Sequence, residues 1–241
     1  MYVKQAANVL ELLEYFARRQ TPARLAEIAD DLGWPRSSTF NIVSTVVEKG
    51  FLYEPQVRSG YYPTPRWLAL AQEVSQAEPV PEQFRALAND LARETGETAA
   101  ISAVAGIHAM FVHVAESNHP VRYFAQVGDR VPIQASSAGR ALLEQLTPAE
   151  RDELYRKIGF DAYSSTSPTS PEAVEHELAA AKVRGYHQSN AEYTPDLAGV
   201  ALPLKGSRPL SVVVVGPVSR CLEKRPQTAA LIKRRVDAIR R

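Results

Sequence analysis

Polar side chains suited to reading a nucleic acid occupy the start of a predicted helix in residues 34–50. Arg36, Ser37, Ser38 and Asn41 fall within its first two turns, while the opposite side of the same helix is apolar. Arginine can form two hydrogen bonds to guanine and asparagine two to adenine. Serines beside the free N–H groups of a helix start can hold a phosphate. The sequence therefore predicts a helix whose polar leading end enters the major groove of DNA.

The preceding residues predict the second helix that such a reading helix needs. We expect Thr21 to cap this helix and Pro22 to occupy its first turn. Gly33 follows its last apolar residue, where a left-handed residue ends helices, and Pro35 opens the next helix. Two helices joined by a tight glycine-containing turn indicate a helix-turn-helix. An ordinary three-helix packing unit is the alternative, because it shows the same pattern.

Two strand-like runs, 51–53 and 61–62, follow the reading helix and predict a hairpin. A hairpin in this position indicates a wing. Arg58, at its tip, is placed to contact phosphate or the minor groove. The alternative is a plain hairpin with a solvated arginine. We expect a winged helix-turn-helix DNA-binding domain over residues 1–64.

Charge does not by itself favour DNA binding. Residues 1–65 contain seven basic side chains (Lys4, Arg18, Arg19, Arg24, Arg36, Lys49 and Arg58) and seven acidic ones, which sum to zero, and the whole chain carries +1. Nonspecific affinity scales with the number of phosphates neutralised, so contacts must come from the placement of charges. A small-molecule sensor or interaction protein without specific DNA binding remains an alternative.

The rest of the chain predicts a linker helix and a larger mixed domain. In residues 65–79 Trp67, Leu70 and Val74 form one apolar side, which we expect to pair two subunits. A proline-rich break ends this helix. Residues 80–241 then mix helices with strands expected at 98–104, 110–114, 122–127, 186–188, 200–204 and 211–215. In the last of these, Val212 to Val215 form an unbroken β-branched run, so this strand is expected at the centre of the sheet. The fold class predicted is α+β.

The sequence gives little support to an enzyme. The small residues 135–139 resemble a nucleophile elbow superficially but lack its first glycine, and there is no Walker or dinucleotide motif. His108, His113 and His119 are spaced so that they do not share one strand face. We expect no catalytic site, metal or cofactor, with a hydrolase as the less favoured reading.

One cysteine, Cys221, excludes an intramolecular disulfide framework and fits a reducing compartment. No apolar run approaches the roughly 18 residues needed to cross a bilayer. We expect a cytoplasmic protein without a secretory signal or membrane contact.

Several segments, in this order and spacing, are shared with a known family. They are the helix at 25–32, Pro35-Arg36-Ser37-Ser38, Lys49-Gly50-Phe51-Leu52, the run 127–132, Ala135-Ser136-Ser137-Ala138-Gly139-Arg140-Ala141-Leu142-Leu143, and Arg184-Gly185-Tyr186 with Glu192 and 199–203. On these segments the whole chain resembles the IclR family of bacterial transcriptional regulators. The resemblance implies a winged helix-turn-helix joined by a linker helix to a GAF-like effector-binding domain. It also implies homodimers or dimers of dimers on a pseudo-palindromic operator, more often as repressors.

The same resemblance implies an effector site where Ser136, Ser137 and Ala138 meet the following helix. Its walls would include Tyr123, Ala125, Val131, Ser189, Leu197 and Gly199. Free N–H groups at a helix start favour an anion by ~0.3–1 kcal/mol, so we expect a small carboxylic acid, aromatic or hydroxylated. Alternatively, the two serines merely cap the helix.

The chain departs from the family pattern at three positions. Asn41 stands where an arginine is usual in the reading helix, which puts the operator sequence in doubt. Ser189 and Gly199 stand where a carboxylate and a cysteine are common. We therefore expect a roomier and less acidic pocket.

Overall fold

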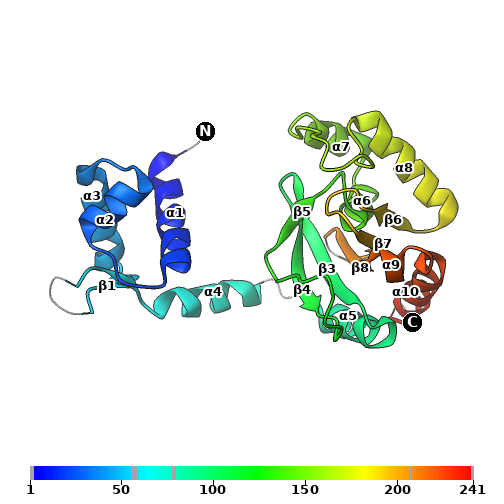
Figure 1. Ribbon diagram of the computed structural model, residues 1–241, viewed down its shortest axis with the longest axis horizontal. Helices are drawn as coiled ribbons and strands as arrows, with labels where there is room; N and C mark the ends of the chain where they lie inside the picture. The colour runs from blue at the N-terminus through cyan, green and yellow to red at the C-terminus, as the bar shows by residue number, and fades with distance from the viewer. Residues whose placement is uncertain (1–2, 56–58, 78–79, 207, 240–241) are drawn as a thin grey trace. The chain divides into compact units, whose positions relative to one another are not determined.

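The computed structural model describes residues 3–55, 59–77, 80–206 and 208–239. They divide into two compact units, Met1–Pro79 (unit 1) and Val80–Arg241 (unit 2), and each unit has a hydrophobic core of its own. In Figure 1 unit 1 contains the elements coloured blue to cyan and unit 2 those coloured green to red.

Unit 1 begins with three helices packed around one core. They are α1 (Lys4–Arg19), α2 (Leu25–Leu32) and α3 (Arg36–Glu48). Leu12, Ile28 and Val43, one from each helix, are almost fully buried together. Leu10 shares the helical spacing of the apolar residues in α1 but is 62% exposed.

The turn between α2 and α3 has the geometry that the sequence predicts. Gly33 adopts a left-handed conformation (φ 65°), which only glycine reaches without strain. Trp34 then donates its N–H to Ala29 O at 2.9 Å and buries its side chain in the core of unit 1. Pro35 is the N-cap of α3. The chain thus turns sharply and starts α3 with its first turn facing outward.

The expected start of α2 is wrong. Thr21 and Pro22 lie outside the helix, which begins at Leu25. The main chain of Ala23 is instead bridged to Tyr61, with N–O distances of 3.0 and 2.8 Å. This bridge fixes the segment before α2 against the hairpin, so residues 21–23 cannot enter the helix.

A two-stranded wing and a fourth helix complete unit 1. Strands β1 (Leu52–Tyr53) and β2 (Tyr62–Pro63) pair antiparallel, and α4 (Arg66–Ala77) follows. The α4 residue Trp67 packs its ring 4.3 Å from that of Phe51 and donates its Nε1–H to Phe51 O at 2.9 Å. The first turn of α4 is thereby attached to the wing.

Unit 2 is built on one antiparallel sheet with the strand order β5-β4-β3-β8-β7-β6. The strands are β3 (Thr98–Ala105), β4 (His108–Ala115), β5 (Arg130–Pro132), β6 (His187–Asn190), β7 (Leu197–Leu204) and β8 (Leu210–Pro217). As expected from its β-branched run, β8 is central. Val212 and Val214 face one core and Val213 faces the other, so both sides of β8 are buried.

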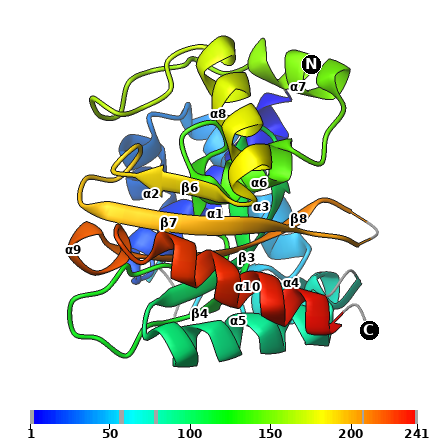
Figure 2. The same ribbon diagram turned by 90° about the vertical axis from the view of Figure 1, so that its right-hand side faces the viewer.

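Helices cover both faces of this sheet. They are α5 (Glu82–Thr95), α6 (Ser137–Leu143), α7 (Pro148–Tyr155), α8 (Pro171–Arg184), α9 (Val218–Cys221) and α10 (Arg225–Ile239). Helices α5 and α10 lie side by side against one face (Figure 2), and α6 and α8 contribute to the core on the other. None of the described helices is long and apolar enough to cross a membrane.

The strand expected at 122–127 does not form. The place beside β4 is taken by β5, a few residues further along the chain. Tyr123 and Ala125 nevertheless pack against the core, while Phe124 and Val127 are 57% and 66% exposed. The alternation therefore predicts which side chains are buried but not which segment joins the sheet.

Candidate functional site

The exposed face of α3 carries most of the side chains expected to read DNA. Arg36, Ser37 and Asn41 are exposed and Ser38 is half-buried. Arg36 forms an ion pair of 3.5 Å with Asp30, in which both side chains are largely exposed. Exposed pairs of this kind contribute little, so Arg36 is readily available to another anion.

The first turn of α3 also offers main-chain donors. Because Pro35 occupies the N-cap, no side chain satisfies the first N–H groups of this 13-residue helix. Ser37 lies beside them, so an approaching phosphate can meet both a hydroxyl and N–H groups. Arg58, the expected contact at the tip of the wing, lies outside the described residues.

Phe40 belongs to the same face and is absent from the predicted set. Its side chain is 57% exposed, one turn beyond Arg36, whereas Thr39 and Val43 point into unit 1. An aromatic ring on a reading helix can contact the methyl group of thymine. The periodicity of the buried residues already places position 40 on the outer side, and this signal could have identified it.

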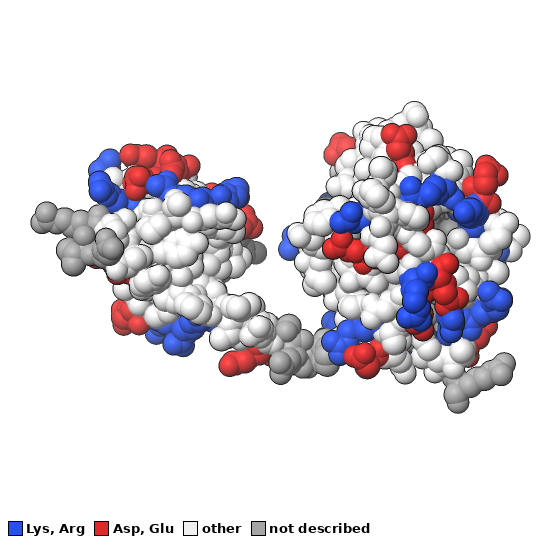
Figure 3. Space-filling view, turned by 60° about the horizontal axis from the view of Figure 1, so that its bottom comes forward, with Lys and Arg blue, Asp and Glu red and all other residues white. Residues whose placement is uncertain are grey.

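Acidic and basic side chains are interspersed on unit 1. In Figure 3 they lie at the edges of the face in view, with a wide uncharged area between them. This arrangement agrees with the balanced charge of residues 1–65 and differs from a continuous basic surface.

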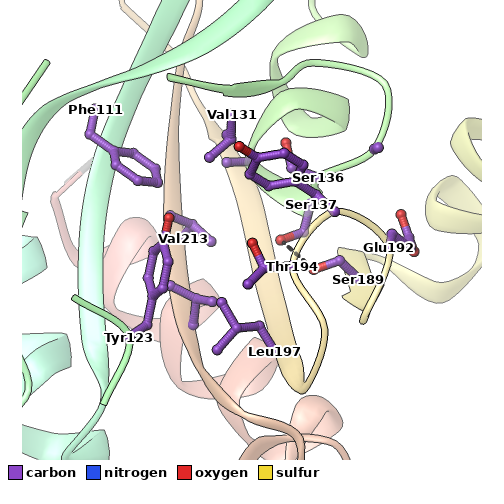
Figure 4. A pocket seen from close by; sticks show the side chains of 14 residues that line it. Phe111, Tyr123, Val131, Ser136, Ser137, Ser189, Glu192, Thr194, Leu197 and Val213 are labelled. Carbon is purple, nitrogen blue, oxygen red and sulfur yellow. Dashed lines mark hydrogen bonds between the residues drawn. The ribbon is translucent and has the colours of Figure 1, made fainter. Parts of the chain in front are cut away.

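Unit 2 contains a small cavity between the sheet and the start of α6 (Figure 4). Its volume is about 50 Å³. The cavity is lined by Phe111, Tyr123, Val131, Ala135, Ser136, Ser137, Ala138, Ser189, Glu192, Tyr193, Thr194, Leu197, Val213 and Val215. Seven of the nine residues expected at the effector site are in this lining.

The two serines of the α6 turn have different surroundings. Ser136 is the N-cap of α6: its Oγ accepts from Gly139 N at 3.1 Å and donates to Pro132 O at 2.8 Å. Ser137 is 2% exposed, and its Oγ accepts a hydrogen bond from Ser189 Oγ at 3.3 Å. Ser136 therefore caps the helix, as the alternative interpretation has it, while Ser137 and Ser189 present a hydroxyl pair at one end of the cavity (Figure 4).

Tyr123 and Phe111 form the other end of the cavity, with ring centroids 6.4 Å apart in an edge-to-face arrangement. Burial raises the pKa of Tyr123 to about 12, and the nearby Asp129 and Tyr193 act in the same direction. The phenol is thus neutral at physiological pH and can donate a hydrogen bond. This end suits an apolar or aromatic group with a polar edge.

Ala125 and Gly199 do not line the cavity. Ala125 is buried in the core beside it. Gly199 lies beneath the hydroxyl pair, where a Cβ would stand 2.7 Å from Ser137 Oγ and 3.0 Å from Ser189 Oγ. The glycine therefore makes room for these hydroxyls and does not enlarge the cavity, contrary to expectation.

A buried ion pair adjoins the cavity and places one carboxylate in its lining. Glu192 lines the cavity and binds Arg140 of α6, which is 1% exposed, at Nη1–Oε2 2.5 Å and Nη2–Oε1 3.1 Å. Both residues belong to segments that suggest the family, yet 52 positions separate them. Nothing in the spacing of the sequence indicates that they meet.

The three histidines considered as metal ligands lie apart from this site. His113 Nε2 is 3.2 Å from Asn89 Oδ1, and His119 lies beside Gly96. Within the described part of the chain, no three His, Cys, Asp or Glu side chains form a group that could hold a metal ion.

Two family profiles together match nearly the whole chain. The IclR helix-turn-helix domain matches residues 5–55, and the bacterial transcriptional regulator IclR C-terminal domain matches residues 72–241. The chain belongs to the IclR family of bacterial transcriptional regulators. As an IclR-family member it is a DNA-binding regulator of transcription, and its helix-turn-helix is the DNA-binding element.

Named relatives agree with this assignment. The regulator is 25% identical over 228 residues to the transcriptional repressor IclR of Escherichia coli strain K12, covering 92% of this chain and 83% of that protein. Thermotoga maritima IclR has a TM-score of 0.77 at 17% identity, covering 98% of this chain and 97% of the other. An IclR homolog from Microbacterium hydrocarbonoxydans, complexed with 4-hydroxybenzoate, has a TM-score of 0.74 at 22% identity, covering 97% and 99%. Both structures share the fold of this chain.

Proposed function

We propose that this IclR-family regulator is a repressor whose affinity for its operator is controlled by a small organic acid. Residues 1–64 bind DNA, 65–79 link subunits, and 80–241 bind the effector. The observation that carries the proposal is the combination of a polar, exposed α3 start with a partly aromatic cavity bordered by hydroxyl groups.

DNA reading is assigned to the outer face of α3. Arg36 and Asn41 contact base edges in the major groove, while Ser37 and Ser38 contact phosphate near the first turn. Arg58 of the wing contacts the backbone or the minor groove. The exposure of Arg36, Ser37 and Asn41 supports this assignment.

Dimerisation is assigned to α4. Leu70 and Val74, on the apolar side of this helix, are 41% and 66% exposed. Covering them with a second copy removes apolar area from water, which favours association. A dimer presents two α3 helices to half-sites about 34 Å apart, or a multiple of that distance, on a pseudo-palindromic operator. Dimers of dimers extend the same arrangement.

The effector is assigned to the cavity of unit 2. Its hydroxyl pair and the Tyr123 phenol suit a carboxylic acid with an aromatic or hydroxylated body, and the relative complexed with 4-hydroxybenzoate supports this class. The cavity volume of about 50 Å³ is well below the several hundred Å³ that are typical of ligand sites. Binding therefore requires side chains to move. Such movement gives the effector the unequal affinity for two arrangements that switching needs.

Protection of the DNA upstream of the regulator's own reading frame tests the proposal. We expect a protected, pseudo-palindromic site, and release of that site by one member of a panel of aromatic and hydroxylated acids. Calorimetric titration of that acid against Ser137→Trp, which fills the cavity, should show lost binding. The exposed Ser219→Trp in α9 is the matched control. Unchanged affinity in the Ser137 variant contradicts the placement of the site.

The balanced charge of residues 1–65 favours one other function, a sensor that lacks specific DNA binding. Salt dependence separates the two. A regulator with six to ten phosphate contacts loses on the order of a thousandfold or more in affinity between about 50 and 200 mM salt. Affinity that is weak and equal for all sequences at low salt supports the sensor.

A further inference from the structure

The cavity of unit 2 poses an electrostatic problem for the effector proposed above. Of the described residues that line it, Glu192 alone carries a full charge at neutral pH, and that charge is negative. A carboxylate brought beside Glu192 is repelled, and an anion buried without a counter-charge is strongly destabilised. The hydroxyl groups of Ser137 and Ser189 can orient such a ligand but cannot neutralise it.

A full positive charge, on Arg140, binds Glu192 but does not line the cavity. The guanidinium of Arg140 is held by Gln134 O, which accepts from Nη1 at 2.9 Å, by Gln188 O, which accepts from Nη2, and by both oxygens of Glu192. Its Nε is buried and has no hydrogen-bond partner among the described residues. Arg140 is therefore fixed in place, and its contact with the lining of the cavity is made through Glu192.

The two partners differ in their freedom to move. Arg140 is 1% exposed and belongs to α6, whereas the Glu192 side chain is 14% exposed and belongs to the loop between β6 and β7. This loop begins and ends with residues of positive φ, Ala191 (51°) and Asp196 (62°). Figure 4 places Glu192 at the same end of the pocket as Ser137 and Ser189. Rotation of the Glu192 side chain toward water would open Arg140 to the cavity.

We propose that Glu192 is a built-in substitute for the effector carboxylate, and that the effector binds by displacing Glu192 from Arg140. The inference rests on the proposed function, since it assumes an acidic effector, and it names the residue that selects for the acid. Exchange keeps one carboxylate on the buried guanidinium before and after binding, so no charge is left unpaired. It also moves the loop that carries Tyr193 and Thr194, two further walls of the small cavity.

The test compares a carboxylate with its neutral analogue. Titrations of 4-hydroxybenzoate and 4-hydroxybenzamide are measured with the wild-type protein and with Glu192→Gln, which keeps the shape of the side chain but weakens its hold on Arg140. We expect the preference for the carboxylate over the amide to rise at least about tenfold in the variant, because charge-assisted pairs with arginine are much stronger than neutral ones. Glu175→Gln, which disrupts the Arg151–Glu175 pair between α7 and α8, is the matched control and should leave the preference unchanged.

A role limited to holding the loop predicts a different result. Loosening the loop changes the affinity for both probes by the same factor, so an unchanged preference in Glu192→Gln overturns the proposal. A preference that shifts toward the amide overturns it as well.

A second measurement does not depend on the identity of the effector. Glu192→Ala empties the space opposite Arg140, and added acetate or benzoate should raise its melting temperature more than that of the wild type or Glu175→Ala. Absence of this rescue overturns the proposal. A wild-type protein whose operator binding ignores every acid contradicts the proposed effector class. Acetate stabilisation of Glu192→Ala would then show that Arg140 can bind a free carboxylate, but exchange by an effector would be overturned.

Discussion

Gly139 in the first turn of α6 lies so close to Ile133 that a Cβ on the glycine would stand 2.1 Å from the carbonyl oxygen of Ile133. No flexible side chain can relieve this contact, because the opposing atoms belong to the main chain. The position of α6, and with it the Ser136–Ser137 turn, depends on this close approach.

Gly139→Ala should therefore destabilise unit 2 by about 1–3 kcal/mol or more, since overpacking forces the backbone to shift. Urea unfolding measures the effect. Gly159→Ala is the control, because its Cβ would meet only the side chain of Asp161, at 3.1 Å. Equal stability of the two variants contradicts the assigned packing.

Arg36→Ala should weaken operator binding selectively. If Arg36 contacts a guanine, its removal costs about 1–3 kcal/mol and relaxes the preference at one base position. Fluorescence anisotropy with a set of single-base operator variants measures both effects. Arg18→Ala, an exposed arginine on α1, serves as the control. A loss that is equal for every operator variant identifies Arg36 as a phosphate contact instead.

Phe40→Ala should reduce operator affinity without lowering the melting temperature, because the ring is 57% exposed and contributes little to the core. Operators in which single thymines are replaced by deoxyuridine test the contact with a thymine methyl. The wild-type protein should lose affinity at one such position, and Phe40→Ala should lose none there. Equal losses in both proteins exclude a methyl contact by this residue.

Val74→Glu on α4 should dissociate the regulator into folded monomers, because a charge on the proposed interface cannot be buried without a partner. Sedimentation velocity measures the association, and circular dichroism confirms that the helices persist. Val183→Glu in α8, at a residue that is 92% exposed, is the matched control. A Val74 variant that sediments as the wild type does removes this side of α4 from the interface.

The Glu144–His187 contact should make stability depend on pH on the acid side. His187 Nε2 lies 2.6 Å from Glu144 Oε2, and this hydrogen bond holds the pKa of Glu144 below its usual 4.5. A carboxyl group whose pKa is lowered by folding stabilises the native state above its unfolded pKa. That contribution is lost as the pH falls through the folded pKa.

Melting temperatures of the wild type and Glu144→Gln, measured from neutral pH downward, test this linkage. The wild type should be the more stable near neutrality, and the difference should shrink below about pH 4.5. A gap that stays constant to lower pH shows that Glu144 acts through packing and not through its charge.

Local sequence signals correctly predict the elements that are determined by their own residues and close neighbours in the chain. Gly33 and Pro35 identify the turn of the helix-turn-helix, and the four valines of β8 identify the central strand. Capping signals fail at Thr21 because Ala23 is bridged to Tyr61, a contact made across 38 residues of chain. Whether residues 122–127 or β5 pair with β4 at the sheet edge is likewise decided by contacts between residues far apart in the chain.

In the candidate site too, some contacts could be predicted from the sequence and others could not. The resemblance placed Ser136, Ser137 and Tyr123 near one another, and they line one cavity. Arg140 and Glu192 could not be paired from the sequence, because their meeting depends on how α6 packs against β6 and the loop after it. The position of Phe40 on the outer face of α3 could be predicted from periodicity alone.

Both tryptophans of the chain, Trp34 and Trp67, belong to unit 1, one in its core and one at the junction of the wing and α4. Their fluorescence emission therefore originates in unit 1, which contacts DNA, while the proposed effector binds unit 2. A change in this emission when an acid is added to the unlabelled protein consequently records the transmission of a signal from unit 2 to unit 1.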